Sequence, residues 1–413
     1  MHALTRQNAV AMFAAFACAY FLSALVRAIT ATLSPTLTQE FDMSAGELGL
    51  LAGGYFFGFA ASQWPMGSWL DRYGPKKVVL SLLAIAILGC CAFAISSSFV
   101  GLLLARVLTG VGVSACLMGP LTAYRRWYAP ATQMRANSWM LMVGSLGMVA
   151  STLPVQWLMP ITGWRPIFWA MALLIMISMA LIFFKVPRWH ALVATANPSP
   201  GSERQQPGYA QVWRHPFFRA MAPMGFFIYG GLVAMQTLWV VPWMTEVAGL
   251  TAFQAAQGMF WLNVAMLITF LAWGWVNPVL ARRGWNASLL ICYGMPLSFV
   301  LLAIIIISER SIVIWSGVLW TLYCMACTVI SLAQPAVALA FPSELAGRAL
   351  SAFNLVVFSG VFVVQWGIGL GIDGFVATGM GKIQAFQYTM GIFLLLTVLS
   401  YANFLCAKSH NPA

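Results

Sequence analysis

Hydrophobic residues fill the chain in long runs, and short polar segments separate these runs. A helix needs about 20 apolar residues to cross a bilayer, and we place twelve segments of that kind. Their ranges are 9–37, 46–70, 78–98, 100–124, 136–160, 166–186, 217–245, 253–280, 286–308, 311–338, 350–373 and 384–407. The narrowest separation, at Ser96 to Ser98, divides the third segment from the fourth. The pattern predicts an all-α membrane protein with twelve transmembrane helices.

One long polar stretch divides the first six segments from the last six. Residues 187–216 contain five prolines, which prevent a continuous helix, and their composition is typical of a linker. We therefore expect an N-terminal six-helix bundle over 1–186, a cytoplasmic linker over 187–216 and a C-terminal six-helix bundle over 217–413.

The two halves repeat two landmarks at nearly the same offset. The sequence LDRYG at 70–74 follows the second segment, and LARRG at 280–284 follows the eighth, 210 residues later. Arg135 opens the fifth segment, and Arg348 opens the eleventh, 213 residues later. Such repeats are the plan of many secondary transporters, in which the substrate site lies at the midplane between the halves. We expect two bundles related by a pseudo-two-fold axis.

Composition and charge narrow the class of protein. Only 7 % of the residues are charged, whereas soluble globular proteins carry about 25 %, so a soluble enzyme is excluded. The net charge of +12 does not indicate nucleic-acid binding, because the basic residues are scattered singly between hydrophobic runs. Sixteen of the 21 lysines and arginines fall in alternate loops, against three in the other loops. This bias predicts cytoplasmic termini in a bacterial-type inner membrane.

A charged motif lies between the second and third segments. It runs from Gly67 through Asp71, Arg72 and Gly74 to a pair of lysines. Gly67 allows close helix approach, Gly74 permits a tight turn, and Asp71 suits a positive helix N-terminus. The motif resembles the G-x-x-x-D-R-x-G-[RK]-[RK] signature of the major facilitator superfamily. The resemblance implies that Asp71 contacts the start of the eleventh segment and closes the cytoplasmic side.

The fourth segment carries Arg106, Gly110 and Gly112 in a spacing similar to the R-x-x-x-G-x-G pattern of the same superfamily. An arginine at this depth is costly unless it is paired or faces a wet cavity. We expect a structural or gating role for Arg106 and assign Arg282 and Arg348, the landmarks of the second half, to the gate as well. The resemblance covers nearly the whole chain.

Within the superfamily, the chain is most similar to the anion:cation symporters, with the nitrate/nitrite porters as a related comparison. The run from Gly58 to Gly67 and an arginine in the first segment carry this resemblance. Two acidic positions of that branch are apolar here, Val26 before Arg27 and Val113 after Arg106. The coupling ion, a proton or sodium, is therefore left open.

Arg27 is the strongest candidate for substrate contact. All nine acidic residues lie in loops or at segment ends, so Arg27 has no evident partner in the sequence. An unpaired cation at membrane depth is a functional hypothesis, and a guanidinium suits a carboxylate through two parallel hydrogen bonds. Further side chains able to line a central cavity are Tyr20, Gln63, Gln236, Trp239, Trp261, Asn263, Tyr323 and Asn354.

The leading hypothesis is a monomeric secondary transporter that takes up a small organic anion by alternating access. The alternative is an efflux pump for amphiphilic drugs or metabolites, which the many aromatic residues favour. An enzyme is not expected, because the four histidines are peripheral and the acidic residues form no cluster. We expect no metal and no cofactor, and we expect membrane lipid around the helices.

Overall fold

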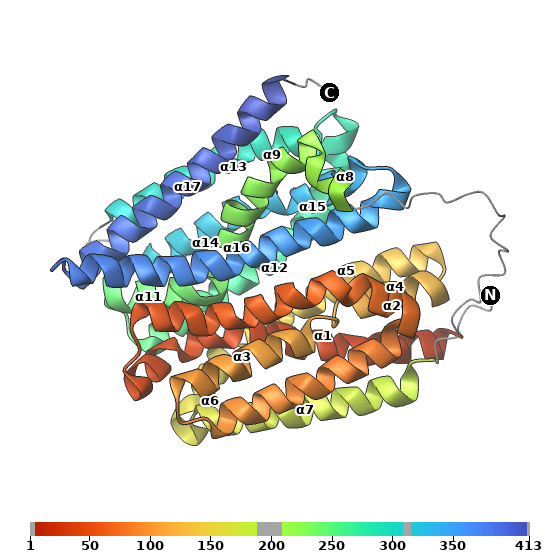
Figure 1. The fold of residues 1–413 in the computed structure, drawn as a ribbon, viewed down its shortest axis with the longest axis horizontal. Coiled ribbons are helices and arrows are strands. Elements are labelled where there is room, and N and C mark those ends of the chain that lie inside the picture. Colours follow the sequence, from red (N-terminus) through yellow and green to blue (C-terminus); the bar gives the residue numbers. More distant parts are fainter. Residues whose placement is uncertain (1–4, 188–208, 309–314, 411–413) are drawn as a thin grey trace.

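The computed structural model describes residues 5–187, 209–308 and 315–410. The elements in these ranges are helices, arranged as two six-helix bundles (Figure 1). Eleven helical stretches of the described chain are long and apolar enough to cross a membrane. One of them, α2, contains two crossings, which gives the twelve predicted. The fold class expected from the sequence is therefore confirmed.

The N-terminal bundle is built from seven helices. The first, second and third crossings come from α1 and α2, and the fourth from α3 with α4. The fifth comes from α5 with α6, and the sixth is α7. The bounds are α1 Arg6–Phe41, α2 Ala45–Ile95, α3 Phe99–Val113, α4 Met118–Trp127, α5 Pro130–Ala150, α6 Leu153–Thr162 and α7 Trp164–Lys185.

The C-terminal bundle begins with two short helices, α8 Tyr209–Arg214 and α9 Pro216–Met224. The seventh crossing continues from α9 through η1 Gly225–Tyr229, α10 Gly230–Ala234, η2 Met235–Trp239, α11 Val240–Pro242 and η3 Trp243–Val247. The remaining crossings are α12 Ala252–Arg282, α13 Ala287–Ile307, α14 Ser316–Cys327 with η5 Thr328–Leu332 and α15 Ala333–Leu339, α16 Ser343–Ala377 and α17 Lys382–His410. Because α8 lies inside the expected linker and 188–208 fall outside the described residues, the limits 187–216 stay a prediction.

The junction between the second and third crossings is a kink rather than a loop. Helix α2 runs through 51 residues, and Gly74 alone interrupts it with non-helical backbone at φ 77°. A positive φ favours glycine because a Cβ would clash there. The narrow break at Ser96 to Ser98 is a true helix end, since Ser98 caps α3 by accepting from the Gly101 amide.

We call the end of the molecule with the Gly74 kink, Arg125 and Arg282 the basic end. The other end, where α1 stops at Phe41, is the Glu40 end. With twelve crossings, the start of α1 and the end of α17 both lie at the basic end (Figure 1). Whether this end faces the cytoplasm stays a prediction.

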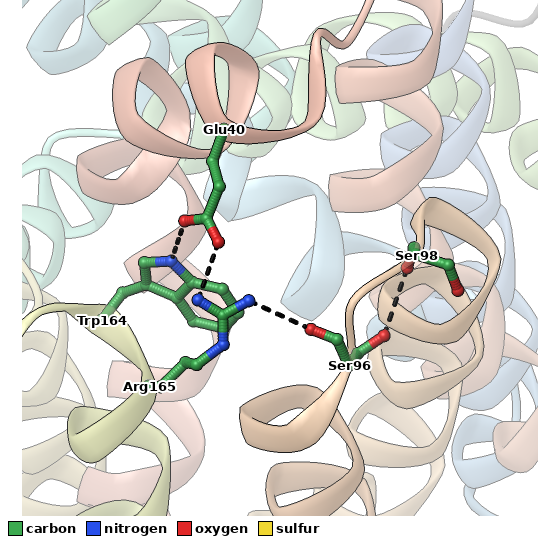
Figure 2. Close-up of polar contacts among 5 residues, drawn as sticks. All are labelled: Glu40, Ser96, Ser98, Trp164 and Arg165. Carbon is green, nitrogen blue, oxygen red and sulfur yellow. Dashed lines mark hydrogen bonds and ion pairs between the residues drawn. The ribbon is translucent and has the colours of Figure 1, made fainter.

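Matched ion pairs tie the crossings together at the Glu40 end. Arg165, at the start of α7, donates to the Glu40 carboxylate at 2.7 Å and to the Ser96 carbonyl at 3.3 Å (Figure 2). Trp164 donates its indole N–H to the other oxygen of Glu40 at 2.6 Å. In the C-terminal bundle, Lys382 pairs with Glu246 at 2.9 Å. In each bundle, the end of the first crossing is thus bound to the start of the sixth.

Small residues let the helices of the N-terminal bundle pack at backbone distance. A Cβ on Gly110 would collide with the Tyr55 carbonyl of α2, and one on Gly112 would collide with the backbone of Ala86. Close packing of this kind supplies the association energy of membrane helices, because lipid gives no hydrophobic driving force between them.

We predict that Gly110→Ala destabilises the bundle by about 1–3 kcal/mol, the usual cost of overpacking. The measurement is thermal unfolding of the purified protein in detergent. Gly274→Ala is the matched control, because a Cβ on Gly274 meets nothing within 4 Å. Equal melting temperatures for the two variants would contradict the packing argument.

Candidate functional site

Arg27 lies at the centre of an aromatic cluster that both bundles supply. Its side chain is half-buried. Tyr20 of α1, Tyr55 of α2 and Tyr229 of η1 lie close enough to interact electrostatically with the guanidinium. The presence of Tyr229 shows that the C-terminal bundle reaches the Arg27 site.

Aromatic rings continue the cluster across the bundle interface. The Phe59 ring of α2 lies 5.8 Å from the Arg27 guanidinium carbon. Phe358 of α16 contacts Phe59 with ring centroids 4.5 Å apart. The site therefore combines one cation with planar apolar surfaces from both bundles.

Several polar atoms in the cluster have no hydrogen-bond partner among the described residues. They are the Arg27 Nε, the Tyr55 hydroxyl and the Ser23 hydroxyl. No described carboxylate forms an ion pair with Arg27. Because buried polar groups are normally hydrogen-bonded, unpaired atoms gathered around one cation mark this cluster as the candidate site.

Arg106 lies beneath this cluster and is fully buried. Its Nη1 donates to the Val26 carbonyl at 2.9 Å, and its guanidinium carbon lies 4.9 Å from the centre of the Tyr55 ring. Arg106 therefore holds the backbone beside Arg27 and supports Tyr55. This position fits the structural role that the sequence predicts for it, away from direct solvent contact.

The polar residues predicted in the C-terminal bundle bind one another. Gln236 donates to the Asn263 side chain at 2.8 Å, and Gln334 donates to the Asn354 side chain at 2.7 Å. The Trp239 indole donates to the Gln365 carbonyl at 3.1 Å. These hydrogen bonds join neighbouring helices, so we assign the residues to packing between helices in this conformation.

The other predicted binding residues lie in three separate places. Gln63 is buried in α2 and, with Ser351 of α16, lines a small cavity towards the basic end. Tyr323 is buried against Trp320 inside the C-terminal bundle. Trp261 is 59 % exposed and packs edge-on against Phe260. Of the predicted binding residues, Tyr20 is thus the one that lies beside Arg27, while Gln236 and Asn263 meet each other inside the C-terminal bundle.

The seventh crossing places its aromatic and amide side chains on three π-helical segments. Tyr229 lies in η1, Gln236 and Trp239 in η2, and Trp243 in η3. Short π segments inside α-helices are frequent at functional sites. Here Tyr229 lies near Tyr20 and Arg27 of the N-terminal bundle, while Gln236, Trp239 and Trp243 contact residues of the C-terminal bundle.

The Glu40 end is closed by a contact between α2 and α16. The Asp373 carboxylate accepts from the backbone N–H groups of Ala45 and Gly46 at 3.0 and 2.7 Å. A carboxylate is stabilised at a helix N-terminus by the free amides and the helix dipole. A Cβ on Gly49 or Gly369 would collide with the backbone of the opposite helix, so the two helices touch here.

The same two helices are apart towards the basic end. A Cβ on Gly67 of α2 or on Gly347 of α16 would meet nothing within 4 Å. Asp71 and Arg72 are exposed, and Arg72 lies over the Tyr73 ring. Asp71 makes no hydrogen bond or ion pair within the described chain, so its predicted contact with the eleventh segment is not formed in this conformation.

The remaining predicted gate residues also lie at the basic end. Arg282 is exposed at the end of α12, Arg348 is half-buried in α16, and Gly74 forms the α2 kink. The molecule is therefore closed at the Glu40 end and open at the basic end, with Arg27 between the two bundles. This arrangement defines a membrane protein of the two-bundle class.

The sequence profile of the Major Facilitator Superfamily matches residues 16–365. The chain belongs to this family, as its motifs predict. The curated relatives described below are named as transporters.

Three curated relatives carry names of organic-anion transporters. The chain is 25 % identical over 57 % of its length to the probable sulfoacetate transporter SauU of Cupriavidus necator, and 26 % over 45 % to the 4-hydroxybenzoate transporter PcaK of Pseudomonas aeruginosa. The matches span 57 % and 41 % of those relatives. A gallate transporter of Pseudomonas putida is 22 % identical over 92 % of the chain and 86 % of the relative.

Solved structures share the fold. A bacterial homologue of the human lysosomal transporter Spinster, in an inward-facing and unoccupied conformation, superposes with a TM-score of 0.78 at 16 % identity, covering 99 % of this chain and 100 % of that one. A D-xylose–proton symporter gives a TM-score of 0.77 at 13 % identity, covering 96 % and 97 %.

We predict that Asp373→Ala loosens the Glu40 end. The change removes both hydrogen bonds to the α2 N-terminus, and losing a helix cap costs about 1 kcal/mol. Spin labels on the exposed residues Asp42 and Thr378 would report the distance between the two bundles at this end. The variant is expected to broaden that distance distribution towards longer values.

Glu47→Gln is the matched control for Asp373→Ala. Glu47 caps the same α2 N-terminus by accepting from the Ser44 amide, but it makes this contact within its own helix. Glu47→Gln should lower the stability of the protein without changing the distance between the two spin labels. An unchanged distribution in Asp373→Ala would show that this carboxylate does not hold the bundles together.

Proposed function

We propose that the protein is a secondary transporter that takes up a small organic carboxylate by alternating access. The observation that carries this proposal is Arg27, a half-buried cation between the two bundles with no carboxylate partner among the described residues. A cation in this position is costly unless an anion pairs with it. Substrate binding would supply that anion.

The surroundings of Arg27 favour a carboxylate attached to a flat ring. Phe59 offers an aromatic surface beside the guanidinium, Phe358 extends that surface, and the Tyr20 and Tyr55 hydroxyls offer hydrogen bonds near the cation. Aromatic rings pair in offset or edge-to-face geometry. The 4-hydroxybenzoate and gallate named for two relatives have this chemistry.

The contacts between α2 and α16 support alternating access. In this conformation Asp373, Gly49 and Gly369 hold the two helices together at the Glu40 end, while their basic ends are apart. In the opposite conformation Asp71 would reach the N-terminus of α16 and close the basic end. Because Phe59 and Phe358 contact each other from these same two helices, a ligand packed against this ring pair would contact both gate helices.

We predict that Arg27→Gln removes the preference for a charged ligand. Benzoate should stabilise the wild type against heat, because a ligand that binds only the folded state adds about 2.7 kcal/mol at a hundred times its Kd. Benzamide, its neutral analogue, should not. Losing charge-assisted hydrogen bonds worth about 1.5–3 kcal/mol should weaken benzoate binding by roughly 10- to 150-fold.

Arg27→Lys keeps the positive charge but loses the planar guanidinium group. Its affinity for benzoate should therefore lie between those of the wild type and Arg27→Gln. The screen should also include sulfoacetate, an anion without a ring. Equal affinity of wild type and Arg27→Gln for every anion would refute the role of Arg27. Accumulation of labelled benzoate by cells that express the protein tests uptake, and its active extrusion would favour the efflux alternative instead.

We also predict that Phe358→Leu lowers affinity for benzoate more than for sulfoacetate. The substitution keeps an apolar side chain but removes the ring surface, a contribution of about 0.5–1.5 kcal/mol for an aromatic pair. Phe393→Leu, which alters an aromatic residue buried elsewhere in the C-terminal bundle, is the control. Parallel losses for both anions would place Phe358 in helix packing rather than in ring recognition.

A further inference from the structure

A second cationic groove lies at the basic end of the N-terminal bundle. It has a volume of about 550 Å³ and is formed where the N-termini of α1 and α5 meet the C-terminus of α4. Arg6 and Arg135 line it together with four aromatic side chains, Phe13, Trp127, Tyr128 and Trp139. It is separate from the Arg27 site, because none of the residues around Arg27 lines it.

The groove is polarised along its length. Arg6 stands in the first turn of α1 and Phe13 seven residues later, which is about 10 Å along a helix. Arg135 and Trp139 stand one turn apart on α5. Both helices therefore present a guanidinium near the membrane surface and an aromatic ring deeper in, with Phe13 and Trp139 in edge-to-face contact.

The electrostatics of the groove favour an anion. The N-terminus of a helix carries a partial positive charge that acidic residues usually offset. Neither α1 nor α5 has an acidic residue in its first turn, and no carboxylate lines the groove. Arg6 and Arg135 are exposed and form no ion pair with a described residue. Two helix N-termini and two guanidinium groups therefore all contribute positive electrostatic potential at the entrance of the groove.

We infer that this groove binds an amphiphilic anion, with its acidic group between Arg6 and Arg135 and its apolar body on Phe13 and Trp139. An anionic phospholipid and an organic carboxylate share that chemistry. Basic pockets between transmembrane helices at a membrane surface are suited to anionic headgroups, while the aromatic lining also accepts a ring. The inference does not depend on the transport function.

The test compares Arg6→Gln/Arg135→Gln with Arg214→Gln/Arg219→Gln. The control pair removes the same charge from two exposed arginines of the C-terminal bundle. Native mass spectrometry of the purified full-length variants would count bound phosphatidylglycerol against phosphatidylcholine with the same acyl chains. If the ligand is a lipid, the groove variant should lose phosphatidylglycerol binding at least several-fold and the control should not.

A second arm tests the soluble ligand. Benzoate titrations on an Arg27→Gln background isolate the groove from the central site. Residual stabilisation that disappears with Arg6→Gln/Arg135→Gln would assign the groove to a carboxylate. If the groove variant and the control behave alike in both arms, with unchanged melting of the ligand-free proteins, the groove is not an anion site.

Discussion

The cost of placing a charge in hydrocarbon governs how this molecule is built. Among the described residues, the carboxylates whose contacts can be followed bind at the ends of helices: Glu40 with Arg165, Glu246 with Lys382, and Asp373 with the α2 N-terminus. Arg106 lies beside the Tyr55 ring and donates to the Val26 carbonyl, while its Nε and Nη2 have no hydrogen-bond partner among the described residues. Arg27 has the Phe59 ring beside it but no ion pair with a described carboxylate, and the proposed anion would complete its environment. A ligand bound there would contact both bundles.

The two bundles are fastened differently at their two ends, and the asymmetry explains the open state. At the Glu40 end, glycines bring α2 and α16 to backbone distance, and a carboxylate on one caps the other. At the basic end the corresponding carboxylate, Asp71, is exposed. The contact at the Glu40 end is an acidic side chain at a helix N-terminus, and the contact proposed for Asp71 would be of the same kind. Such a contact is strong enough to hold a state and weak enough to release it.

Much of the fold could be predicted from the sequence, because hydrophobic length and loop charge act locally. Arg27 stood out because few polar groups interrupt the crossings. The rest of its site could not be predicted: Tyr55, Phe59 and Phe358 are as well suited to face lipid as to face a ligand, and only the packing of helices decides between these. Asp373 was missed as well, since a carboxylate at a segment end is ordinary. Trp261 was predicted to line the cavity, but its side chain is exposed, because the sequence alone does not show which face of a helix points outward.

The continuity of α2 has a mechanical consequence. Its two crossings are joined by a kink at Gly74 and not by a flexible loop. A tilt of the first crossing, which contacts α16, is therefore transmitted directly to the second crossing. That second half packs against α3 and α7, and Arg165 ties α7 back to α1. In the proposed alternating-access mechanism the N-terminal bundle would therefore move as one rigid body, and the opening angle at one membrane face would fix the angle at the other.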